Sequence, residues 1–314
     1  DNNSVFLNRN FLQINVTAND ATIGLKNITI NLYNGTDDTL NITNASSTSP
    51  HFLNLTNLAD GLYEFNATAY DLIEHANWTE TRSVTIDTVN PIITFVDPTT
   101  NTSNLSQSWI FGNISITETN FEEFNLTLFN SAGIKLTSVN NSTSPNWFNF
   151  TGLSDGLYYL NATANDSARN TNFSITRTIN LDTTNPLVTL VSPTNNTLEE
   201  TTNTIYHIYN VTDSSNINNC SLYLNNSLEQ TITNINKDTN QTFIKTLPSG
   251  IYNWSVECTD SASNSFRTDE YNLSIDVTAP TTVLDNPPHE YNSSSNSVEF
   301  NCSAIDNAAL TNIT

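Results

Sequence analysis

The sequence is poor in methionine, glycine, cysteine and basic residues. Its 314 residues include no Met, 8 Gly, 3 Cys and 9 Lys+Arg against 31 Asp+Glu, so the formal net charge at pH 7 is −22. Because a protein needs Lys and Arg to meet phosphates, this charge excludes binding to nucleic acid and to anionic membrane surfaces. No apolar run is long enough for a signal peptide or a membrane span. The absence of Met predicts a mature or internal piece of a longer protein.

Sequence patterns that carry catalysis are missing as well. The four histidines are scattered, and none pairs with a Cys or Asp at the spacing of zinc ligands. The sequence has no Gly-x-Ser-x-Gly, no phosphate-cradling glycine loop and no dinucleotide fingerprint. Spacing alone does not exclude a pair of glycosidase carboxylates. We nevertheless predict that this segment is not an enzyme, because its acidic sites recur at every repeat junction.

What the sequence does contain is an internal repeat. Tyr63, Tyr158 and Tyr252 each follow a Gly-x pair, and they are 95 and 94 residues apart. An Asp-x-x-x-Pro motif keeps the same phase, since its prolines at 91, 186 and 280 are also 95 and 94 residues apart. Two landmarks with one period indicate tandem domains of about 95 residues. Proline stops a strand, so the residues before each proline are interpreted as linkers.

The repeat predicts four segments in a linear array. They are residues 1–87, which lack the first strand, two whole repeats at 88–182 and 183–276, and an N-terminal fragment of a fourth repeat at 277–314. Apolar and polar residues alternate along each predicted strand, for example over 12–18, 28–32 and 252–258. No segment has a convincing helical period. About seven short strands in each repeat predict an all-β fold of tandem β-sandwiches.

The repeat resembles a known family. A Gly-x-Tyr opens a late strand, an Ala/Cys-x-Asp closes it, and an Asn follows four residues later, as in Asp166 to Asn170 and Asp260 to Asn264. With the Asp-x-x-x-Pro linker, this pattern resembles the immunoglobulin-like repeats of prokaryotic, in particular archaeal, cell-surface and extracellular-fibre glycoproteins. The resemblance implies an immunoglobulin-like sandwich and an extracellular or cell-surface location. It also implies that Tyr63, Tyr158 and Tyr252 form tyrosine corners.

The cysteines are interpreted through this resemblance. Cys220 heads the inward side of a third strand and Cys258 ends the inward side of a late strand, and these strands are antiparallel neighbours in such a sandwich. The resemblance therefore implies a Cys220–Cys258 disulfide, which suits an oxidising compartment. The alternative is a pair of small buried hydrophobic side chains. Cys302 is expected to pair with a cysteine beyond residue 314.

Asparagine is abundant, and more than half of it lies in the sequence motif for N-glycosylation. Of 53 Asn, 29 lie in Asn-x-Ser/Thr sequons, about twice the number expected by chance. Strand alternation accounts for part of the excess, but many of these asparagines are on the outward side of strands, where a large hydrated glycan needs to be. We predict heavy N-glycosylation. The predicted carriers are Asn15, Asn27, Asn34, Asn66, Asn77, Asn113, Asn125, Asn161, Asn210, Asn225, Asn253, Asn272 and Asn301.

Acidic residues are predicted to gather where one repeat enters the next. In the resembled fold, the linker Asp, the loop after the second strand and the loop after the late strand share one end of the sandwich. Three carboxylates with nearby carbonyls form the kind of oxygen cage that holds Ca²⁺. The alternative is that these side chains only cap turns. The predicted ligands are Asp87, Glu118 and Asp166 at one junction, and Asp182, Asp213 and Asp260 at the next.

Two functions from different classes remain. The first is a structural repeat region of a heavily N-glycosylated extracellular stalk, sheath or fibre, whose partners are neighbouring repeats or copies of itself. The second is an adhesin that binds a surface carbohydrate or protein. Trp78, Trp109 and Trp147 occupy unrelated registers, so no repeated aromatic platform is expected, which favours the structural function.

The repeat frame also leaves two modes of connection open. Residues 1–87 lack a first strand, while the C-terminal segment carries a first strand at 281–284 and a second at 298–304. Either the chain continues covalently at both ends, or the end of one subunit completes the start of the next. Cys302 favours the first mode, because the late strand of residues 1–87 has no cysteine to pair with it.

Overall fold

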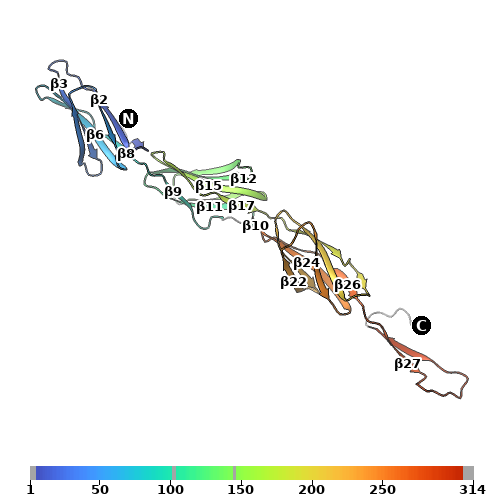
Figure 1. Ribbon diagram of the computed structural model, residues 1–314. Helices are drawn as coiled ribbons and strands as arrows, with labels where there is room; N and C mark the ends of the chain where they lie inside the picture. The colour runs from blue at the N-terminus through green and yellow to red at the C-terminus, as the bar shows by residue number, and fades with distance from the viewer. Residues whose placement is uncertain (1–4, 101–103, 144–145, 307–314) are drawn as a thin grey trace. The chain divides into compact units, whose positions relative to one another are not determined.

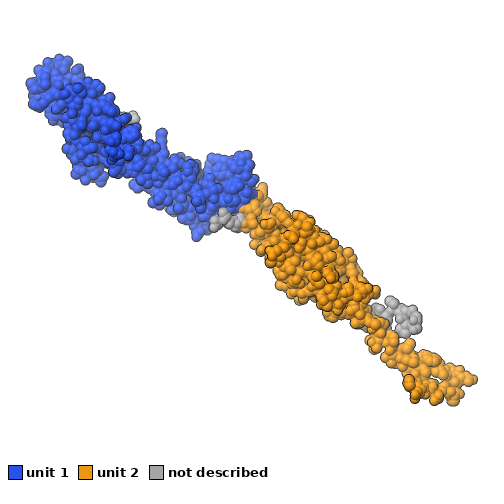
Figure 2. Space-filling view, in the orientation of Figure 1, with its two compact units in different colours: residues 1–102, 109–152, 157–179 blue, residues 103–108, 153–156, 180–314 orange. Residues whose placement is uncertain are grey.

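The computed structural model describes residues 5–100, 104–143 and 146–306 (Figure 1). All regular structure in these residues is β, as the alternating pattern predicts, and the fold is a tandem of immunoglobulin-like β-sandwiches. Among the same residues no helix has the length and apolar character needed to cross a membrane. The chain forms two compact units, one of residues 1–102, 109–152 and 157–179, the other of residues 103–108, 153–156 and 180–314 (Figure 2).

The first sandwich packs a small sheet of β2 and β5 against a larger sheet. The order in the larger sheet is β1-β8-β6-β3-β4, and β7 pairs with β6. Leu12 and Ile14 of β2 share one core with Ile28, Ile30 and others of β3, because alternate residues of each strand face the same side. The strands are β1 (Val5–Leu7), β2 (Phe11–Val16), β3 (Leu25–Asn34), β4 (Leu40–Ser46), β5 (His51–Thr56), β6 (Gly61–Asp71), β7 (Ala76–Trp78) and β8 (Arg82–Ile86).

The second sandwich has three strands in its smaller sheet. The orders are β14-β11-β9 and β10-β17-β15-β12-β13, with β16 paired to β15. The fully buried Ile110 and Ile114 of β11 lie on the same face of their strand, as do Leu126 and Leu128 of β12. The strands are β9 (Ile92–Phe95), β10 (Asn104–Leu105), β11 (Trp109–Thr117), β12 (Phe121–Asn130), β13 (Lys135–Asn141), β14 (Asn146–Thr151), β15 (Gly156–Asp166), β16 (Thr171–Phe173) and β17 (Arg177–Leu181).

The third sandwich repeats this topology. Its sheets have the orders β18-β20-β23 and β19-β26-β24-β21-β22, with β25 paired to β24. Trp254, Val256 and Cys258 form the buried face of β24, as the sequence predicts for this strand. The strands are β18 (Leu187–Ser192), β19 (Thr197–Glu199), β20 (Thr204–Thr212), β21 (Ile217–Leu224), β22 (Ser227–Thr233), β23 (Asn240–Thr246), β24 (Gly250–Asp260), β25 (Ser265–Arg267) and β26 (Tyr271–Ile275).

Two further strands follow the third sandwich. β27 (Thr281–Asn286) and β28 (Asn301–Ile305) form an antiparallel pair in which every residue of β27 is exposed. Val298, Phe300 and Cys302 are exposed as well, so the apolar side chains of this segment cover no core in the described residues. The division of the chain into four repeats stays a prediction.

The strand count of each sandwich exceeds the predicted seven. Each has a strand of two or three residues that pairs in parallel with the last strand, namely β1, β10 and β19. Each also has a three-residue return strand beside the long late strand, namely β7, β16 and β25. Strands this short contain too few residues to display apolar alternation, so a sequence pattern does not detect them.

Tyr63 and Tyr252 form the tyrosine corners that the resemblance implies for them. The hydroxyl of Tyr63 donates to the carbonyl of Ala59 at 3.0 Å, and that of Tyr252 donates to the carbonyl of Pro248 at 2.9 Å. In each case the acceptor lies four residues before the tyrosine. Each bond ties the loop that enters the long late strand to the strand itself.

Candidate functional site

The structure brings the six predicted carboxylates together in two clusters. Asp87, Glu118 and Asp166 each offer an oxygen that lies within 4.8 Å of the others, and Asp182, Asp213 and Asp260 do the same. The aspartates at 87, 166, 182 and 260 are 4% exposed or less. A buried carboxylate requires a compensating charge or hydrogen bonds.

In the first cluster, amides hold the carboxylates. Asp166 accepts hydrogen bonds from the backbone and side-chain nitrogens of Asn170, at 2.8 and 2.7 Å. Asp87 accepts one from the side chain of Asn120 at 2.6 Å. One oxygen of Glu118 caps its own loop by accepting from the backbone nitrogens of Thr119 and Asn120.

In the second cluster, the same positions carry a partly different set of donors. Asp260 accepts from the backbone and side chain of Asn264, at 2.9 and 2.8 Å. Asp182 accepts from the hydroxyl of Ser215, which takes the place that Asn120 has in the first cluster. One oxygen of Asp213 accepts from the backbone of Ser215 at 2.7 Å, and its other oxygen is buried with no hydrogen-bond partner.

Both clusters contain one shared device, which we call the asparagine lock. The side-chain nitrogen of Asn170 donates to the backbone carbonyl of Asp87 at 2.8 Å, and that of Asn264 donates to the carbonyl of Asp182 at 2.7 Å. Each asparagine thus ties a linker to the sandwich that follows it. The sequence singles out both asparagines by their spacing from Asp166 and Asp260, but not their bond to the linker.

A lysine distinguishes the second cluster. The ammonium of Lys237 donates to the carbonyls of Asp213, Ser214 and Ser215 at 2.8 to 3.1 Å. The pKa of the Asp213 carboxyl is raised, chiefly by burial and also by the neighbouring Asp182 and Asp260 carboxylates, while the Ser215 backbone bond and the Lys237 charge lower it. No cationic side chain in the described residues bonds in this way to the loop at 118–120 of the first cluster.

The first sandwich carries an equivalent aspartate with a partner four residues later. Asp71 accepts from the backbone of His75 at 2.8 Å, and its other oxygen lies 3.1 Å from Nδ1 of His75. The pair is therefore equivalent to Asp166–Asn170 and Asp260–Asn264. Asp20 caps the neighbouring loop by accepting from the backbone of Thr22, as Glu118 and Asp213 cap theirs.

The chemistry of the two clusters fits a hard cation. Ca²⁺ takes six to eight oxygen ligands, and each cluster supplies three carboxylates on separate loops. In the second cluster the unpartnered oxygen of Asp213 is the natural ligand atom. Lys237 there uses three carbonyls that would otherwise be available to a cation.

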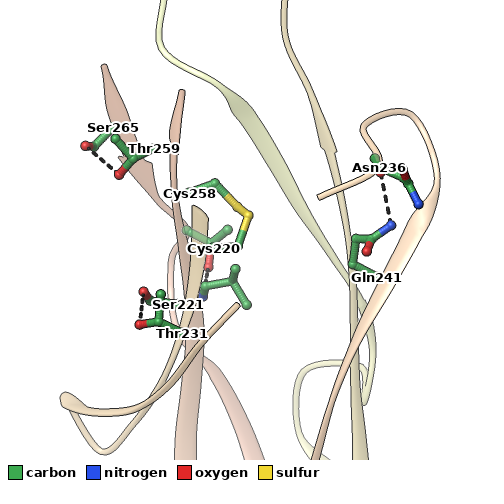
Figure 3. Close-up of a disulfide and its surroundings, with 10 residues drawn as sticks. Cys220, Ser221, Thr231, Asn236, Gln241, Cys258, Thr259 and Ser265 are labelled. Atoms are coloured by element: carbon green, nitrogen blue, oxygen red, sulfur yellow. Dashed lines mark hydrogen bonds between the residues drawn. A yellow bond between two sulfur atoms is a disulfide. The ribbon is translucent and has the colours of Figure 1, made fainter. Parts of the chain in front are cut away.

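The third sandwich contains the predicted cysteine pair as a disulfide. Cys220 of β21 and Cys258 of β24 lie directly opposite each other in the antiparallel register, with Cα atoms 4.1 Å apart (Figure 3). Both residues are fully buried. The bond therefore links two neighbouring strands of one sheet, in the arrangement that the resemblance implies. Cys302 is a free, exposed thiol on β28.

The predicted glycan carriers all lie outside the core. None of the 13 asparagines is buried. Those that are most exposed are Asn15, Asn77, Asn225, Asn272 and Asn301. Asn66 and Asn161 share one position, three residues after Tyr63 and Tyr158, whereas Asn253 directly follows Tyr252.

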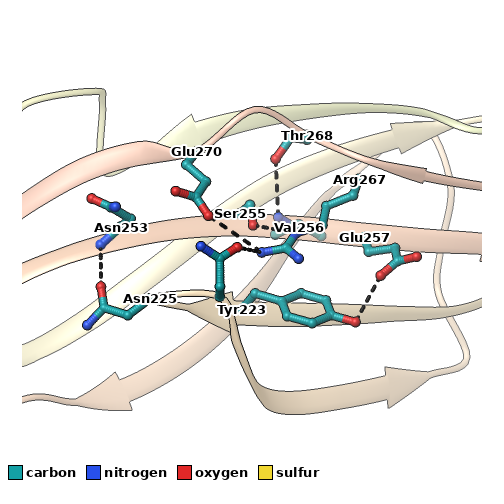
Figure 4. Close-up of polar contacts among 10 residues, drawn as sticks. Tyr223, Asn225, Asn253, Ser255, Val256, Glu257, Arg267, Thr268 and Glu270 are labelled. Carbon is teal, nitrogen blue, oxygen red and sulfur yellow. Dashed lines mark hydrogen bonds and ion pairs between the residues drawn. The ribbon is translucent and has the colours of Figure 1, made fainter.

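The surroundings of Asn225 and Asn253 form a polar face on the third sandwich. The backbone nitrogen of Asn253 donates to the side-chain oxygen of Asn225 at 2.9 Å, which leaves the Asn225 amide nitrogen, the atom that carries an N-glycan, outside that bond (Figure 4). Nearby, Arg267 lies 4.0 Å above the Tyr223 ring and donates to the hydroxyl of Ser255 at 2.9 Å. These contacts order a polar surface around the predicted attachment sites.

Two tryptophans of the second sandwich lie on the same face of its smaller sheet. Trp147 of β14 is 63% exposed and stacks on Phe111 of β11, with ring centroids 5.5 Å apart. Trp109 is on the same face of β11 as Phe111, two residues away. The sequence does not predict this neighbourhood, because it depends on the pairing of β11 with β14. Trp78 belongs to the first sandwich.

The core of the third sandwich holds a polar group that the sequence does not single out. His207 is fully buried, and neither of its ring nitrogens has a hydrogen-bond partner. Its ring lies 4.9 Å from that of Trp254, whose indole nitrogen is also unpartnered. Burial, with a smaller effect of the Lys245 charge, lowers the pKa of His207 to about 4. The equivalent residue of the second sandwich is Gly112.

Comparisons with known proteins give a likeness of fold. No protein-family model matches the sequence, and no curated protein matches it. The fibronectin(III)-like modules of Clostridium thermocellum CbhA are 16% identical, over 59% of this chain and 94% of that chain, with a TM-score of 0.35. The FN1-FN3 domains of chicken CNTN1 are 10% identical, over 85% and 95%, with a TM-score of 0.30. The D1-D4 ectodomain fragment of ICAM-5 is 12% identical, over 90% and 78%, with a TM-score of 0.45.

Proposed function

We propose that this chain is the structural repeat region of an N-glycosylated extracellular stalk, sheath or fibre, in which the sandwiches provide reach and the linkers provide stiffness. It resembles archaeal surface glycoproteins in its repeat pattern, and its partners are other repeats or copies of itself. The disulfide supports an oxidising, extracellular location. Sequon asparagines that all lie outside the core support a glycan coat.

One observation carries the proposal: the asparagine lock recurs at both junctions. Asn170 and Asn264 bind successive linkers by the same bonds, 2.8 and 2.7 Å long. A ligand-binding protein needs one well-formed site, whereas a structural repeat needs each unit to be fixed to its neighbour. Both locks are buried, so they hold the linker rather than present a surface.

Glycopeptide mass spectrometry of the native protein tests the coat. We expect hexose-containing additions on several of the 13 predicted asparagines, including Asn66 and Asn161, which share one position in two sandwiches. A matched internal control is Asn170, which is not in a sequon and is buried, and so must be bare. Unmodified peptides at Asn66, Asn161 and Asn253 together would contradict the glycoprotein part of the proposal.

We further propose that calcium binds the two carboxylate clusters and stabilises the linkers. Three carboxylates at each junction repel one another, and a divalent cation relieves that repulsion. Thermal unfolding with calcium, with magnesium and with a chelator tests this. Calcium is expected to raise the midpoint more than magnesium does, and D166N is expected to reduce the effect. Identical curves in calcium and chelator would contradict a cation at either cluster.

A second function, an adhesin, has one observation in its favour. Trp147 is exposed and stacks on Phe111, and such aromatic pairs stack on the apolar face of sugar rings. Titration of tryptophan fluorescence with oligosaccharides tests it, with W147A as the variant and W78A as the control. Saturable quenching lost only in W147A would favour the adhesin over the purely structural function.

A further inference from the structure

An exposed aromatic ring recurs on the outer face of the smaller sheet in the first two sandwiches. Phe52 of β5 is 57% exposed and Trp147 of β14 is 63% exposed. The two residues are 95 residues apart, which is the period of the repeat. An exposed ring forgoes the free energy that burial of its apolar surface provides. Its recurrence at one position of the repeat therefore points to something that covers it.

Each of these rings faces an asparagine of a glycosylation motif. In the antiparallel registers Phe52 lies directly opposite Asn15, and Trp147 lies directly opposite Asn113. Asn15 is followed by Val-Thr and Asn113 by Ile-Ser, so both belong to sequons. Residues directly opposite each other have Cβ atoms about 4.5 to 5.5 Å apart on one face of the sheet. A sugar on either asparagine therefore begins beside the ring of its partner.

The third sandwich has neither an asparagine nor an aromatic ring at this pair of described positions. The residue that corresponds to Asn113 is Ile208, since each directly precedes the inward residue opposite the fourth position after the linker proline. Ile208 lies opposite Thr242, which is 95 residues after Trp147. The sequon and the ring thus occur together in two sandwiches and are replaced together in the third. This joint replacement indicates that the ring serves the asparagine rather than the sheet.

In the second sandwich the ring is part of a larger apolar surface, which we call the aromatic platform. Phe111, two residues before Asn113 on the same face of β11, stacks on Trp147. The ring centroids are 5.5 Å apart and the ring planes differ by 25°. The C–H groups on the apolar face of a sugar ring pack well on aromatic surface of this kind.

A hydrogen bond orients the Asn113 amide beside the platform. Its side-chain nitrogen donates to the carbonyl of Asp97 at 3.0 Å. N-glycosylation exchanges one N–H bond for a bond to the anomeric carbon of an activated sugar. The phosphate carrier of that sugar departs with the electron pair of its broken bond, and the amide proton passes to the transferring enzyme. Because the nitrogen keeps its second hydrogen, the bond to Asp97 is compatible with a glycan.

We propose that N-glycans on Asn15 and Asn113 are held against their sandwiches by Phe52 and Trp147, which pack on the first sugar of each glycan. The rings are thus binding sites for the chain's own carbohydrate. The proposal deepens the glycan coat of the proposed function and rests on it. It gives Trp147 a role in a structural protein, whereas an adhesin would use the same ring for the sugar of another molecule.

A neighbouring sequon competes for the platform. Asn149, which is followed by Phe-Thr, lies opposite Phe111, and its side-chain oxygen is buried with no hydrogen-bond partner. Its counterpart in the first sandwich, Asn54, lies opposite Gln13. Because the aromatic ring recurs only opposite the asparagines of β2 and β11, the platform belongs to Asn113.

The test measures how exposed the rings are in the native glycoprotein. Hydroxyl-radical footprinting, followed by mass spectrometry, gives the oxidation rate of each aromatic side chain. S115A removes the sequon but keeps Asn113 and its bond to Asp97, and N149Q removes the neighbouring sequon instead. Trp78 of the first sandwich, which is 70% exposed, is the internal reference.

We expect Trp147 to be oxidised at least about threefold faster in S115A than in the wild type, and at the wild-type rate in N149Q. T17A should expose Phe52 in the same way. Nuclear Overhauser contacts should join the Trp147 indole to the first sugar in the wild type. Equal Trp147 rates in the wild type and S115A, a rate raised only in N149Q, or the lack of these contacts would overturn the proposal.

Glycopeptide analysis separates failure of this proposal from failure of the glycan coat. Bare Asn15 and Asn113 in a protein that carries sugar on Asn66 and Asn161 would overturn the proposal and leave the coat intact. Sugar on none of the predicted carriers would overturn both. Saturable binding of a free oligosaccharide to Trp147 in the wild type would contradict the proposal in favour of the adhesin.

Discussion

The two carboxylate clusters hold their linkers by the same bonds but balance their charge differently. Asn170 and Asn264 make equivalent contacts to a linker carbonyl and to an aspartate. In the second cluster Lys237 places an ammonium on three carbonyls of the adjoining loop. In the described part of the first cluster the carboxylates accept only from backbone and side-chain amides.

Comparison of the two clusters shows which contact is common to the junctions and which is specific to one of them. The bond from the asparagine to the linker is present in both clusters, so it is the structural element. The source of positive charge differs, so it is an adaptation of each junction. The second and third sandwiches also differ inside, because only the third has a disulfide and a buried histidine.

The largest effect is expected from the disulfide. Replacing Cys220 and Cys258 by Ser opens a crosslink that spans 38 residues, which contributes roughly 3 to 4 kcal/mol in the loop-entropy model. Hydrogen exchange of β21 and β24 amides should accelerate accordingly, while those of β12 and β15 keep their rates. C302S is the control. Equal loss of protection in both sandwiches would contradict the separation of their cores.

Acid should destabilise the third sandwich selectively. The pKa of His207 is about 4 in the folded protein and near 6.5 when unfolded, so the unfolded state binds the proton more readily between these values. Stability is therefore complete above pH 6.5, falls as the pH drops, and has lost about 3 kcal/mol by pH 4.

H207L removes this dependence and is the matched variant. Chemical unfolding at pH values from 7 to 4, monitored by hydrogen exchange of β20 and β11 amides, measures the stability of the third and second sandwiches in one sample. If the free energy of unfolding of the wild type falls with pH no more steeply than that of H207L, the histidine does not couple the stability of the fold to pH.

Loss of the asparagine lock should reduce the local stability of both junctions to the same extent. N170A and N264A each remove the side-chain donor of a linker carbonyl and one of the donors of a buried carboxylate, which keeps its backbone bond, at a cost of about 1 to 3 kcal/mol. Hydrogen exchange of the backbone amides at 88–90 and at 183–185 measures this loss of stability. An effect at one junction only would mean that the two clusters are not equivalent in their locking bond.

The smallest effect concerns Lys237. We expect calcium to stabilise the first cluster more than the second, because the ammonium already balances charge there. K237M should increase the stabilisation by calcium at the second cluster by about 1 kcal/mol, the size of a partly exposed ionic interaction. The difference in calcium response between the two clusters should therefore become smaller. Calcium-dependent exchange at 118–120 and 213–215 reports the two loops. K237M without any change in the calcium response of loop 213–215 would contradict this account of the lysine.

The sequence predicts those parts of the fold that rest on alternation and on period. The buried faces of β3 and β24 follow from residue alternation, whereas the tyrosine corners at 63 and 252 and the meeting of six distant carboxylates follow from the resemblance to immunoglobulin-like repeats. What it does not reveal depends on strand pairing. The stacking of Trp147 on Phe111 arises only once β11 and β14 are in register. The burial of His207 is hidden because a histidine at an inward position leaves no pattern of its own.

The central claim is that each linker is built into the sandwich that follows it. Backbone ¹⁵N relaxation of the linkers at 87–91 and 182–186 tests this most directly. We predict order parameters near 0.85, as in the strands, with a clear decrease in N170A at the first linker only and in N264A at the second only. Order parameters below about 0.6 in both wild-type linkers would contradict the claim, because such motion is incompatible with a carbonyl held by a buried asparagine.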